Sequence, residues 1–191
     1  LNCLLYFLET QLANIHPTEG NSYIEKAANR KKAIEKYFWN EEQKFFCDFD
    51  LVKNSVRQNL TLAGVFPLYF NLANNAQAES VANLLEDKFL KNGGLLTTTS
   101  ESGQQWDAPN GWAPLQWIAY VGLKNYGYKK IADQIKTNWV KLNETTFSKS
   151  GKFTEKYNVS SSDAETGGGE YPNQDGFGWT NGVYLSFKKE G

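Results

Sequence analysis

Apolar side chains recur at intervals of three and four residues along most of the chain, and this spacing predicts helices rather than strands. The helical pattern covers residues 2–15, 21–38, 59–74, 76–90, 114–126 and 128–143, and a last stretch that begins near 177–181 and runs to the end. Pro67 either kinks the third of these helices or marks its first turn. The Asn-Gly-Gly run at 92–94 suits a left-handed C-terminal cap on the fourth. The chain is therefore predicted to be all-α.

Segments without a helical period separate these helices. Residues 39–57 are predicted to form a short extended excursion or an irregular loop. Residues 95–112 are predicted to form a long loop, and residues 144–159 a hairpin that turns at 149–152. The helices thus come in pairs, joined alternately by tight turns and by long aromatic and polar loops. Such antiparallel helical hairpins can be wrapped side by side into a toroid, in which the loops at one end build a site. The helices predicted here would fill only part of that ring.

Composition excludes several kinds of partner. The chain has 191 residues, 40% of them hydrophobic, and a net charge of -1, so no basic excess attracts nucleic acid or an anionic membrane. No apolar run approaches the roughly 18 residues of a membrane-spanning helix. His16 is the only histidine, and Cys3 and Cys47 lack metal-ligand spacing, so we expect neither a metal site nor a cofactor. His16 precedes a proline, where we expect a loop role.

The two cysteines are too few for a disulfide framework. We expect Cys3 and Cys47 to be free buried thiols, which leaves the compartment, periplasmic or cytoplasmic, open. No methionine occurs, and Leu1 already belongs to the first helical pattern without a capping residue before it. We therefore expect polypeptide upstream of Leu1.

The first candidate for chemistry is the run 104–112, Gln-Gln-Trp-Asp-Ala-Pro-Asn-Gly-Trp. Tryptophan faces can stack on the C–H side of a pyranose, while aspartate and amides hydrogen-bond its hydroxyls. The alternative is that Asp107 or Asn110 caps the following helix and that the tryptophans belong to the core. Without further information the two interpretations are about equal.

The second candidate is the run 167–182, which opens with three glycines followed by Glu170. Consecutive glycines allow unusual dihedral angles and movement, as a lid over a sugar would need. A phosphate-binding loop is excluded because no Lys-Ser/Thr pair follows the glycines and no strand of a dinucleotide-binding fold precedes them.

The third candidate is Glu155, in the run 153–158. By itself it looks like an ordinary exposed glutamate beside a lysine. Glycoside hydrolysis requires two carboxyl groups that flank the scissile bond. The candidate carboxylates are Asp107, Glu155, Glu170 and Asp175, and their spacing does not choose among them.

The chain resembles the inverting trehalases of glycoside hydrolase family 37 in three runs: 104–114, 167–182 and the opening Leu-Asn-Cys-Leu-Leu-Tyr at 1–6. The resemblance implies an (α/α)6 barrel of helical hairpins with long active-site loops. It also implies hydrolysis of α,α-trehalose to two glucose molecules with inversion of configuration.

The resemblance also implies roles for individual residues. Glu155 matches the family's general base, in a Glu-Lys-Tyr segment, which would deprotonate the attacking water. Glu170 matches a glutamate that contacts substrate hydroxyls. The positions that match the lining of the sugar pocket are Gln105, Trp106, Asp107 and Trp112.

One family element is missing. The family's general acid is an aspartate in a Glu-Ser-Gly-Trp-Asp segment, whereas the Glu-Ser-Gly at 101–103 runs directly into the later signature. The arginine-rich motifs of the family's N-terminal half are absent as well. We therefore predict that residues 1–191 are the C-terminal portion of a single catalytic domain, an incomplete barrel, and that the acid comes from an N-terminal portion, either a separate chain or a missing segment.

An incomplete barrel has an energetic consequence. Exposing 1,000 Å² of apolar surface, as an illustration, would forfeit roughly 25 kcal/mol, more than the net stability of most domains. We therefore expect the chain to be inactive alone and to fold well only beside its counterpart. The alternative is a non-catalytic sugar-binding or scaffolding remnant of a trehalase. Another helical-barrel glycosidase with a different substrate is a minor possibility.

Overall fold

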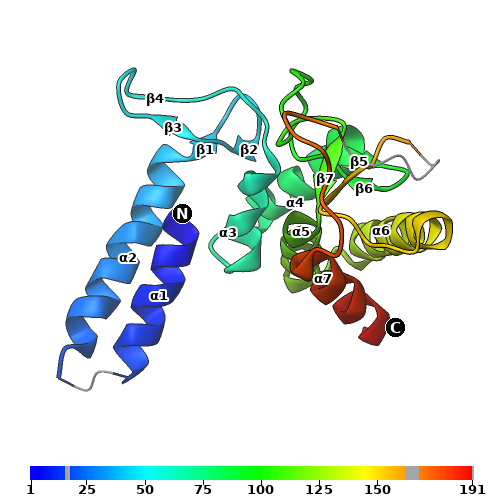
Figure 1. Ribbon diagram of the computed structural model, residues 1–191. Coiled ribbons are helices and arrows are strands. Elements are labelled where there is room, and N and C mark those ends of the chain that lie inside the picture. The colour runs from blue at the N-terminus through cyan, green and yellow to red at the C-terminus, as the bar shows by residue number, and fades with distance from the viewer. Residues whose placement is uncertain (16–17, 162–167, 191) are drawn as a thin grey trace.

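Helices dominate the computed structural model, which describes residues 1–15, 18–161 and 168–190. The helices are α1 (Asn2–Ile15), α2 (Gly20–Tyr37), α3 (Phe66–Tyr69), α4 (Asn75–Leu84), α5 (Ala113–Asn125), α6 (Lys129–Ser150) and α7 (Gly178–Lys189). Figure 1 shows α1 and α2 as one hairpin and α3 to α7 as a second group, with most of the strands and long loops at the upper end of the view. The predicted all-α class is confirmed.

Four short two-stranded antiparallel ribbons lie between the helices in the part of the chain that the structure describes. They pair β1 (Trp39–Asn40) with β2 (Phe45–Phe46), β3 (Phe49–Asp50) with β4 (Ser55–Val56), β5 (Leu90–Lys91) with β6 (Gly94–Leu95), and β7 (Asn110–Trp112) with β8 (Lys156–Asn158). The first two pairs form the extended excursion predicted for residues 39–57. The last pair joins segments that lie far apart in the sequence.

The first helical hairpin is held by a polar clamp as well as by apolar packing. The guanidinium of Arg30 on α2 donates to both carboxylate oxygens of Glu9 on α1, at 2.9 and 2.7 Å, and to Asn2 at 2.8 Å. The Phe7 ring on α1 packs against Phe70, which follows α3, at 5.5 Å between centroids. Both helices begin and end where the apolar spacing predicts, within one residue.

Helix α5 lies at the centre of the larger core and packs against α3, α6 and α7. A glycine at 122 permits the contact with α3, because a Cβ there would lie 3.0 Å from Tyr69 N and 3.1 Å from Leu68 Cβ. The buried amide of Gln116 accepts from Leu95 N and donates to Leu95 O, both at 2.8 Å. Gln116 therefore satisfies the backbone groups of Leu95 that a further strand beside β6 would otherwise pair, and it fixes the β5–β6 ribbon to α5.

The single helix predicted over 59–74 is wrong. Residues 62–65 form a 3₁₀ turn (η1, Leu62–Val65), and the α-helical part is the short α3, with Pro67 in its first turn. Thr61 pairs with Thr98 as an isolated bridge, and Leu62 N donates to Thr97 O at 2.7 Å. This pairing with a distant segment keeps the backbone extended up to Thr61 and delays the helix.

The cap predicted at 92–94 is also wrong. Helix α4 passes into a π turn (η2, Leu85–Phe89), after which Asn92 and Gly93 form the turn of the β5–β6 ribbon and Gly94 begins β6. Gly94 has a φ of +132°, and a Cβ on Gly93 would lie 2.5 Å from Leu142 Cδ2. The glycines are needed because another segment approaches closely, not because a helix ends there.

The hairpin predicted over 144–159 is wrong in its first arm. Helix α6 continues to Ser150 and ends at Gly151, whose φ of +70° is a left-handed cap. The second arm is extended, as predicted, but β8 pairs with β7 and not with residues 144–150.

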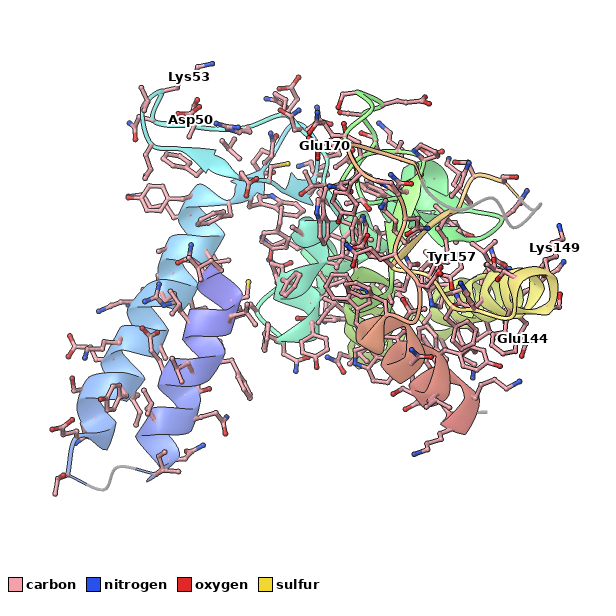
Figure 2. All side chains as sticks on the ribbon, in the orientation of Figure 1. Asp50, Lys53, Glu144, Lys149, Tyr157 and Glu170 are labelled. Atoms are coloured by element: carbon pink, nitrogen blue, oxygen red, sulfur yellow. The ribbon has the colours of Figure 1, made fainter. Side chains whose placement is uncertain are left out.

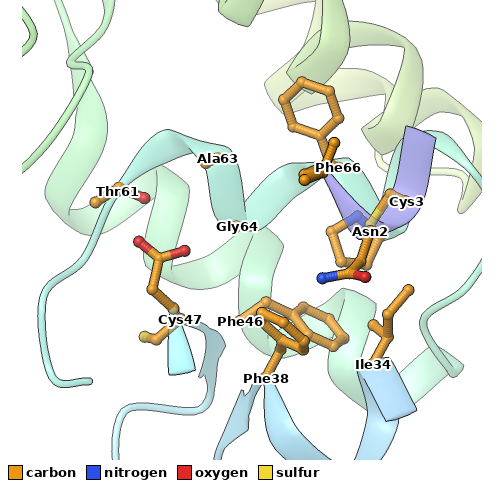
Figure 3. A pocket seen from close by; sticks show the side chains of 13 residues that line it. Asn2, Cys3, Ile34, Phe38, Phe46, Cys47, Thr61, Ala63, Gly64 and Phe66 are labelled. Carbon is orange, nitrogen blue, oxygen red and sulfur yellow. The ribbon is translucent and has the colours of Figure 1, made fainter. Parts of the chain in front are cut away.

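The prediction of free buried thiols is confirmed for Cys3 and Cys47. Burial raises the pKa of each thiol to about 11. Both cysteines line a cavity of about 210 Å³ between the start of α1, the end of β2 and the η1 turn (Figure 3). His16 lies outside the described residues. None of the helices that the structure describes is long and apolar enough to cross a membrane.

Candidate active site

The β7–β8 ribbon brings two of the candidate runs together. Strand β7 belongs to the run 104–112 and β8 to the run 153–158, and the register places Gly111 opposite Tyr157 and Trp112 opposite Lys156. A Cβ on Gly111 would lie 2.4 Å from Val159 Cγ1, so this close approach requires a glycine. Sequence spacing did not predict this pairing.

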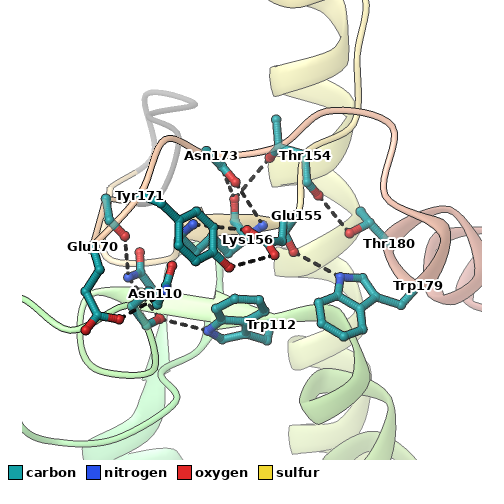
Figure 4. A network of polar contacts seen from close by, with 12 residues as sticks. Asn110, Trp112, Thr154, Glu155, Lys156, Glu170, Tyr171, Asn173, Trp179 and Thr180 are labelled. Atoms are coloured by element: carbon teal, nitrogen blue, oxygen red, sulfur yellow. Dashed lines mark hydrogen bonds and ion pairs between the residues drawn. The ribbon is translucent and has the colours of Figure 1, made fainter.

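Glu155 immediately precedes β8 and is buried, with 4% of its surface exposed. One carboxylate oxygen, Oε1, accepts from the Tyr171 hydroxyl at 2.9 Å, and the other, Oε2, accepts from Lys156 Nζ at 3.2 Å (Figure 4). Its backbone carbonyl accepts from Trp179 Nε1 at 3.1 Å. The first impression of an ordinary exposed glutamate is therefore wrong.

Lys156 supplies the charge that makes this burial possible. Its side chain is fully buried, and its ammonium lies 4.5 Å from the centre of the Tyr171 ring and 5.6 Å from that of Trp112. A buried carboxylate without a counter-charge would cost several kcal/mol, and so would the ammonium alone. Glu155, Lys156 and the two rings over the cation therefore form one unit, in which the opposite charges offset each other's cost of burial.

Asn173 fixes the backbone of this unit. Its side-chain amide donates to Lys156 O at 2.8 Å and accepts from Lys156 N at 3.4 Å. Glu155 N donates to Gln174 O at 2.8 Å, and Thr154 pairs with Asp175 as an isolated bridge. The segment 173–175 therefore lies directly along the segment that carries Glu155.

The loop Gly168–Tyr171 lies on the run 104–112. Asn110 Nδ2 donates to Gly168 O at 2.9 Å, and Gln105 Nε2 donates to Glu170 Oε2 at 3.1 Å. Gly169 has a φ of +143°, and a Cβ there would lie 2.6 Å from Gln105 Cβ. Gly169 is thus required for this close packing, whereas a Cβ on Gly168 would meet nothing within 4 Å. Gly167 lies outside the described residues.

The tryptophans divide between core and surface. Trp112 is buried, and Trp106 stacks on it with the ring centres 3.9 Å apart and the planes at 1°. Trp106 is 48% exposed, so part of its surface is open to a ligand. Trp179 meets Trp112 edge-on at 5.6 Å. The alternative that these tryptophans are core residues is therefore right for Trp112 and not for Trp106.

Asp107 makes its contacts inside its own loop. Thr98 Oγ1 donates to Oδ1 at 2.8 Å and Ser102 Oγ donates to Oδ2. These hydrogen bonds, the one from Ser102 first, lower the pKa of the Asp107 carboxyl despite its partial burial. Neither Asp107 nor Asn110 caps α5, because the N-cap position is Trp112, whose side chain makes no capping hydrogen bond to the helix. The capping alternative is wrong.

Of the four candidate carboxylates, the structure places Glu155 and Glu170 in one hydrogen-bonded cluster. Asp175 instead pairs with the exposed Lys152 at 2.6 Å. Lys156, Tyr171, Asn173 and Trp179 were not predicted as site residues, although all four lie within the runs that the sequence singles out. Gln105 Oε1 and Asn110 Oδ1 are buried and without a hydrogen-bond partner in the described part of the chain. No group of three potential metal ligands occurs among those residues.

The arrangement of helices is found in solved glycoside hydrolases. The neutral trehalase Nth1 of Saccharomyces cerevisiae superposes with a TM-score of 0.82 and 27% identity, over 99% of this chain and 37% of that one. The GH63 mannosylglycerate hydrolase of Thermus thermophilus shares the fold, with a TM-score of 0.74 and 22% identity over 98% of this chain and 44% of that one. The fold is therefore that of the (α/α)6 barrel class, as predicted.

The family model for trehalases matches residues 1–190. The periplasmic trehalase of Escherichia coli K12 is 47% identical over 190 residues, which cover 97% of this chain and 34% of that protein. The chain therefore belongs to the trehalase family. It spans about a third of the length of the curated relatives it matches.

Proposed function

We propose that this chain is the C-terminal portion of a single trehalase catalytic domain that hydrolyses α,α-trehalose to two glucose molecules with inversion. In this proposal Glu155 is the general base and the chain builds part of the sugar pocket. The general acid comes from the N-terminal portion of the domain. Family membership and the 47% identity to periplasmic trehalases support the reaction.

The observation that carries the proposal is the environment of Glu155. A general base must be ionised, oriented and shielded from bulk water. The Lys156 ammonium at 3.2 Å supplies the counter-charge of an ionised carboxylate, and the Tyr171 hydroxyl at 2.9 Å holds its other oxygen. A proton donor would not be placed against a buried cation, so the environment favours the base role over the acid role.

The sugar pocket is proposed around the run 104–112. The exposed part of the Trp106 ring offers a stacking surface for a pyranose, and Trp112 supports it from behind. Gln105 and Glu170, joined at 3.1 Å, offer polar groups for sugar hydroxyls. Asp107 stiffens the loop through Thr98 and contributes to the pocket in that way.

Neither of the two candidate aspartates suits the role of general acid. Both oxygens of Asp107 accept hydrogen bonds from hydroxyls, and its lowered pKa keeps it ionised. Asp175 is exposed and paired with Lys152. Helix α1 also exposes Leu4, Leu8 and Ile15 along one face, as an edge of an incomplete ring would. These features support an upstream portion as the partner of this chain.

The test is Glu155→Gln in the chain assembled with an upstream trehalase portion. Loss of a general base should lower kcat for trehalose by about 10²- to 10⁴-fold. Glu144→Gln is the matched control, since Glu144 is an exposed glutamate on α6 that is also paired with a lysine and a tyrosine (Figure 2). Near-normal turnover in Glu155→Gln would refute the assignment. Trehalose binding without hydrolysis by the unaltered assembly would favour a non-catalytic remnant.

The incomplete ring is tested separately. Light scattering and a thermal melt of the isolated chain should show association or a broad transition, because the apolar face of α1 has no cover within the described residues. A monomer that melts cooperatively would contradict this part of the proposal.

A further inference from the structure

Tyr171 joins the loop Gly168–Tyr171 to the carboxylate of Glu155. Its hydroxyl donates to Glu155 Oε1 at 2.9 Å, and its ring lies 4.5 Å above the Lys156 ammonium. The side chain is 37% exposed, so it forms the outer surface over a carboxylate that is itself 4% exposed. The proposed base therefore lies beneath this one ring.

The same short loop is anchored at two other points. Gly168 O accepts from Asn110, and Glu170 accepts from Gln105, one residue before Tyr171. Both partners belong to the run 104–112, and Figure 4 shows Asn110 and Glu170 on one side of the Tyr171 ring and Glu155 on the other. We call the loop seated when these two hydrogen bonds hold it on the run 104–112. In the seated loop the backbone that carries Glu170 also places the Tyr171 hydroxyl at Glu155.

The carboxylate needs this second donor to have a defined orientation. Lys156 holds only Oε2, and rotation about the terminal carboxylate bond is soft. With Oε1 also held, one lone pair on each oxygen has a fixed direction, and a general base works only when a lone pair points at the proton it removes. A single flexible ammonium contact does not fix that direction.

We propose that Tyr171 is a positioning residue that fixes the Glu155 carboxylate through its hydroxyl and makes this orientation depend on the seating of the loop Gly168–Tyr171. The inference rests on the proposed function for its kinetic consequence, but the contact itself does not. The loop then contributes to turnover, and not only to sugar binding, because an unseated loop leaves the base misaligned.

The kinetic test is Tyr171→Phe in the assembled protein. Phenylalanine keeps the ring over Lys156 and removes only the hydroxyl, so a thermal melt should match the unaltered protein. We expect kcat to fall about 10- to 100-fold, the range for one hydrogen bond to a charged group, with KM within about twofold. Tyr184→Phe is the matched control, since Tyr184 donates to the exposed Glu144 at 3.0 Å. Unchanged kcat, or a rise in KM alone, would overturn the inference.

A second measurement needs no activity. In protein labelled with ¹³C at tyrosine Cζ, the Tyr171 resonance is assigned by its absence from Tyr171→Phe. Glu155→Gln should shift that resonance and leave the Tyr184 resonance in place. If trehalose is not cleaved but the shift appears, the proposed function fails while the positioning contact stands. If the Tyr171 resonance keeps its chemical shift in Glu155→Gln, the inference is overturned, whatever the kinetic result.

Discussion

Replacing Gly169 by alanine should unseat the loop that covers Glu155. The glycine has a φ of +143°, and an added Cβ would lie 2.6 Å from Gln105 Cβ and 3.0 Å from Gln105 Cα. Gln105 cannot withdraw easily, because its carbonyl accepts from Trp112 Nε1 at 3.0 Å and from Asn110 Nδ2 at 3.2 Å. The loop itself must therefore move.

The magnitude follows from two costs. A non-glycine residue at such a φ costs about 1–3 kcal/mol, and forced overpacking costs about 1–3 kcal/mol more. Since part of this cost is relieved when the loop moves away from Gln105, we take about 2 kcal/mol as the free energy by which the packed loop is destabilised relative to the displaced loop. That corresponds to roughly a 30-fold shift toward the unseated loop. Global stability should change by less than about 1 kcal/mol, because the loop is peripheral.

Two assays test this expectation. Hydrogen exchange of the peptide that covers Gly168–Tyr171 should accelerate, and kcat for trehalose in the assembled protein should fall, while the thermal melt moves little. Gly168→Ala is the matched control, since a Cβ at that neighbouring position meets nothing within 4 Å. Equal behaviour of the two alanine variants would refute the reasoning from close contact.

Two further predictions concern the core. Gln116→Leu should lower the free energy of unfolding by about 2–5 kcal/mol in chemical denaturation, since it leaves Leu95 N and O buried without partners; Gln134→Leu on the exposed side of α6 should change it by less than about 0.5 kcal/mol. Folding raises the pKa of Cys3 and Cys47 from 9.0 to about 11. The contribution of the two thiols to the free energy of unfolding is therefore complete below about pH 9 and is lost as the pH rises through about 11. If a double alanine variant lost free energy of unfolding just as steeply over that pH range, this prediction would be contradicted.

The spacing of apolar residues predicts the limits of a helix correctly where the helix packs along a regular apolar stripe. Helices α1 and α2 lie within a residue of the predicted limits, and α5 begins and ends within one residue of its own. The end of α6 was missed because residues 144–150 are rich in serine and threonine, which usually favour turns. There the hydroxyls of Thr145, Thr146 and Ser150 donate to carbonyls four residues back, and Thr146 is buried, so packing sustains the helix.

In the site, too, some features could be predicted from the sequence and others could not. The runs 104–112 and 167–182 could be recognised because their residue types and spacing are written in the chain itself. Their mutual contacts could not, since Tyr171 and Glu155 are sixteen residues apart, and Gln105 and Glu170 sixty-five. Such pairs depend on which backbone segments the fold brings together.

The sequence by itself thus determined the helical class, the family and the short list of carboxylates, because periodicity and motifs are local properties. Only the tertiary structure decided that Glu155 is buried against Lys156 and beneath Tyr171, that Asp107 is turned into its own loop, and that Asp175 pairs with an exposed lysine. The physical reason is that burial and charge compensation are set by neighbours in space, and in this chain those neighbours come from three separate loops.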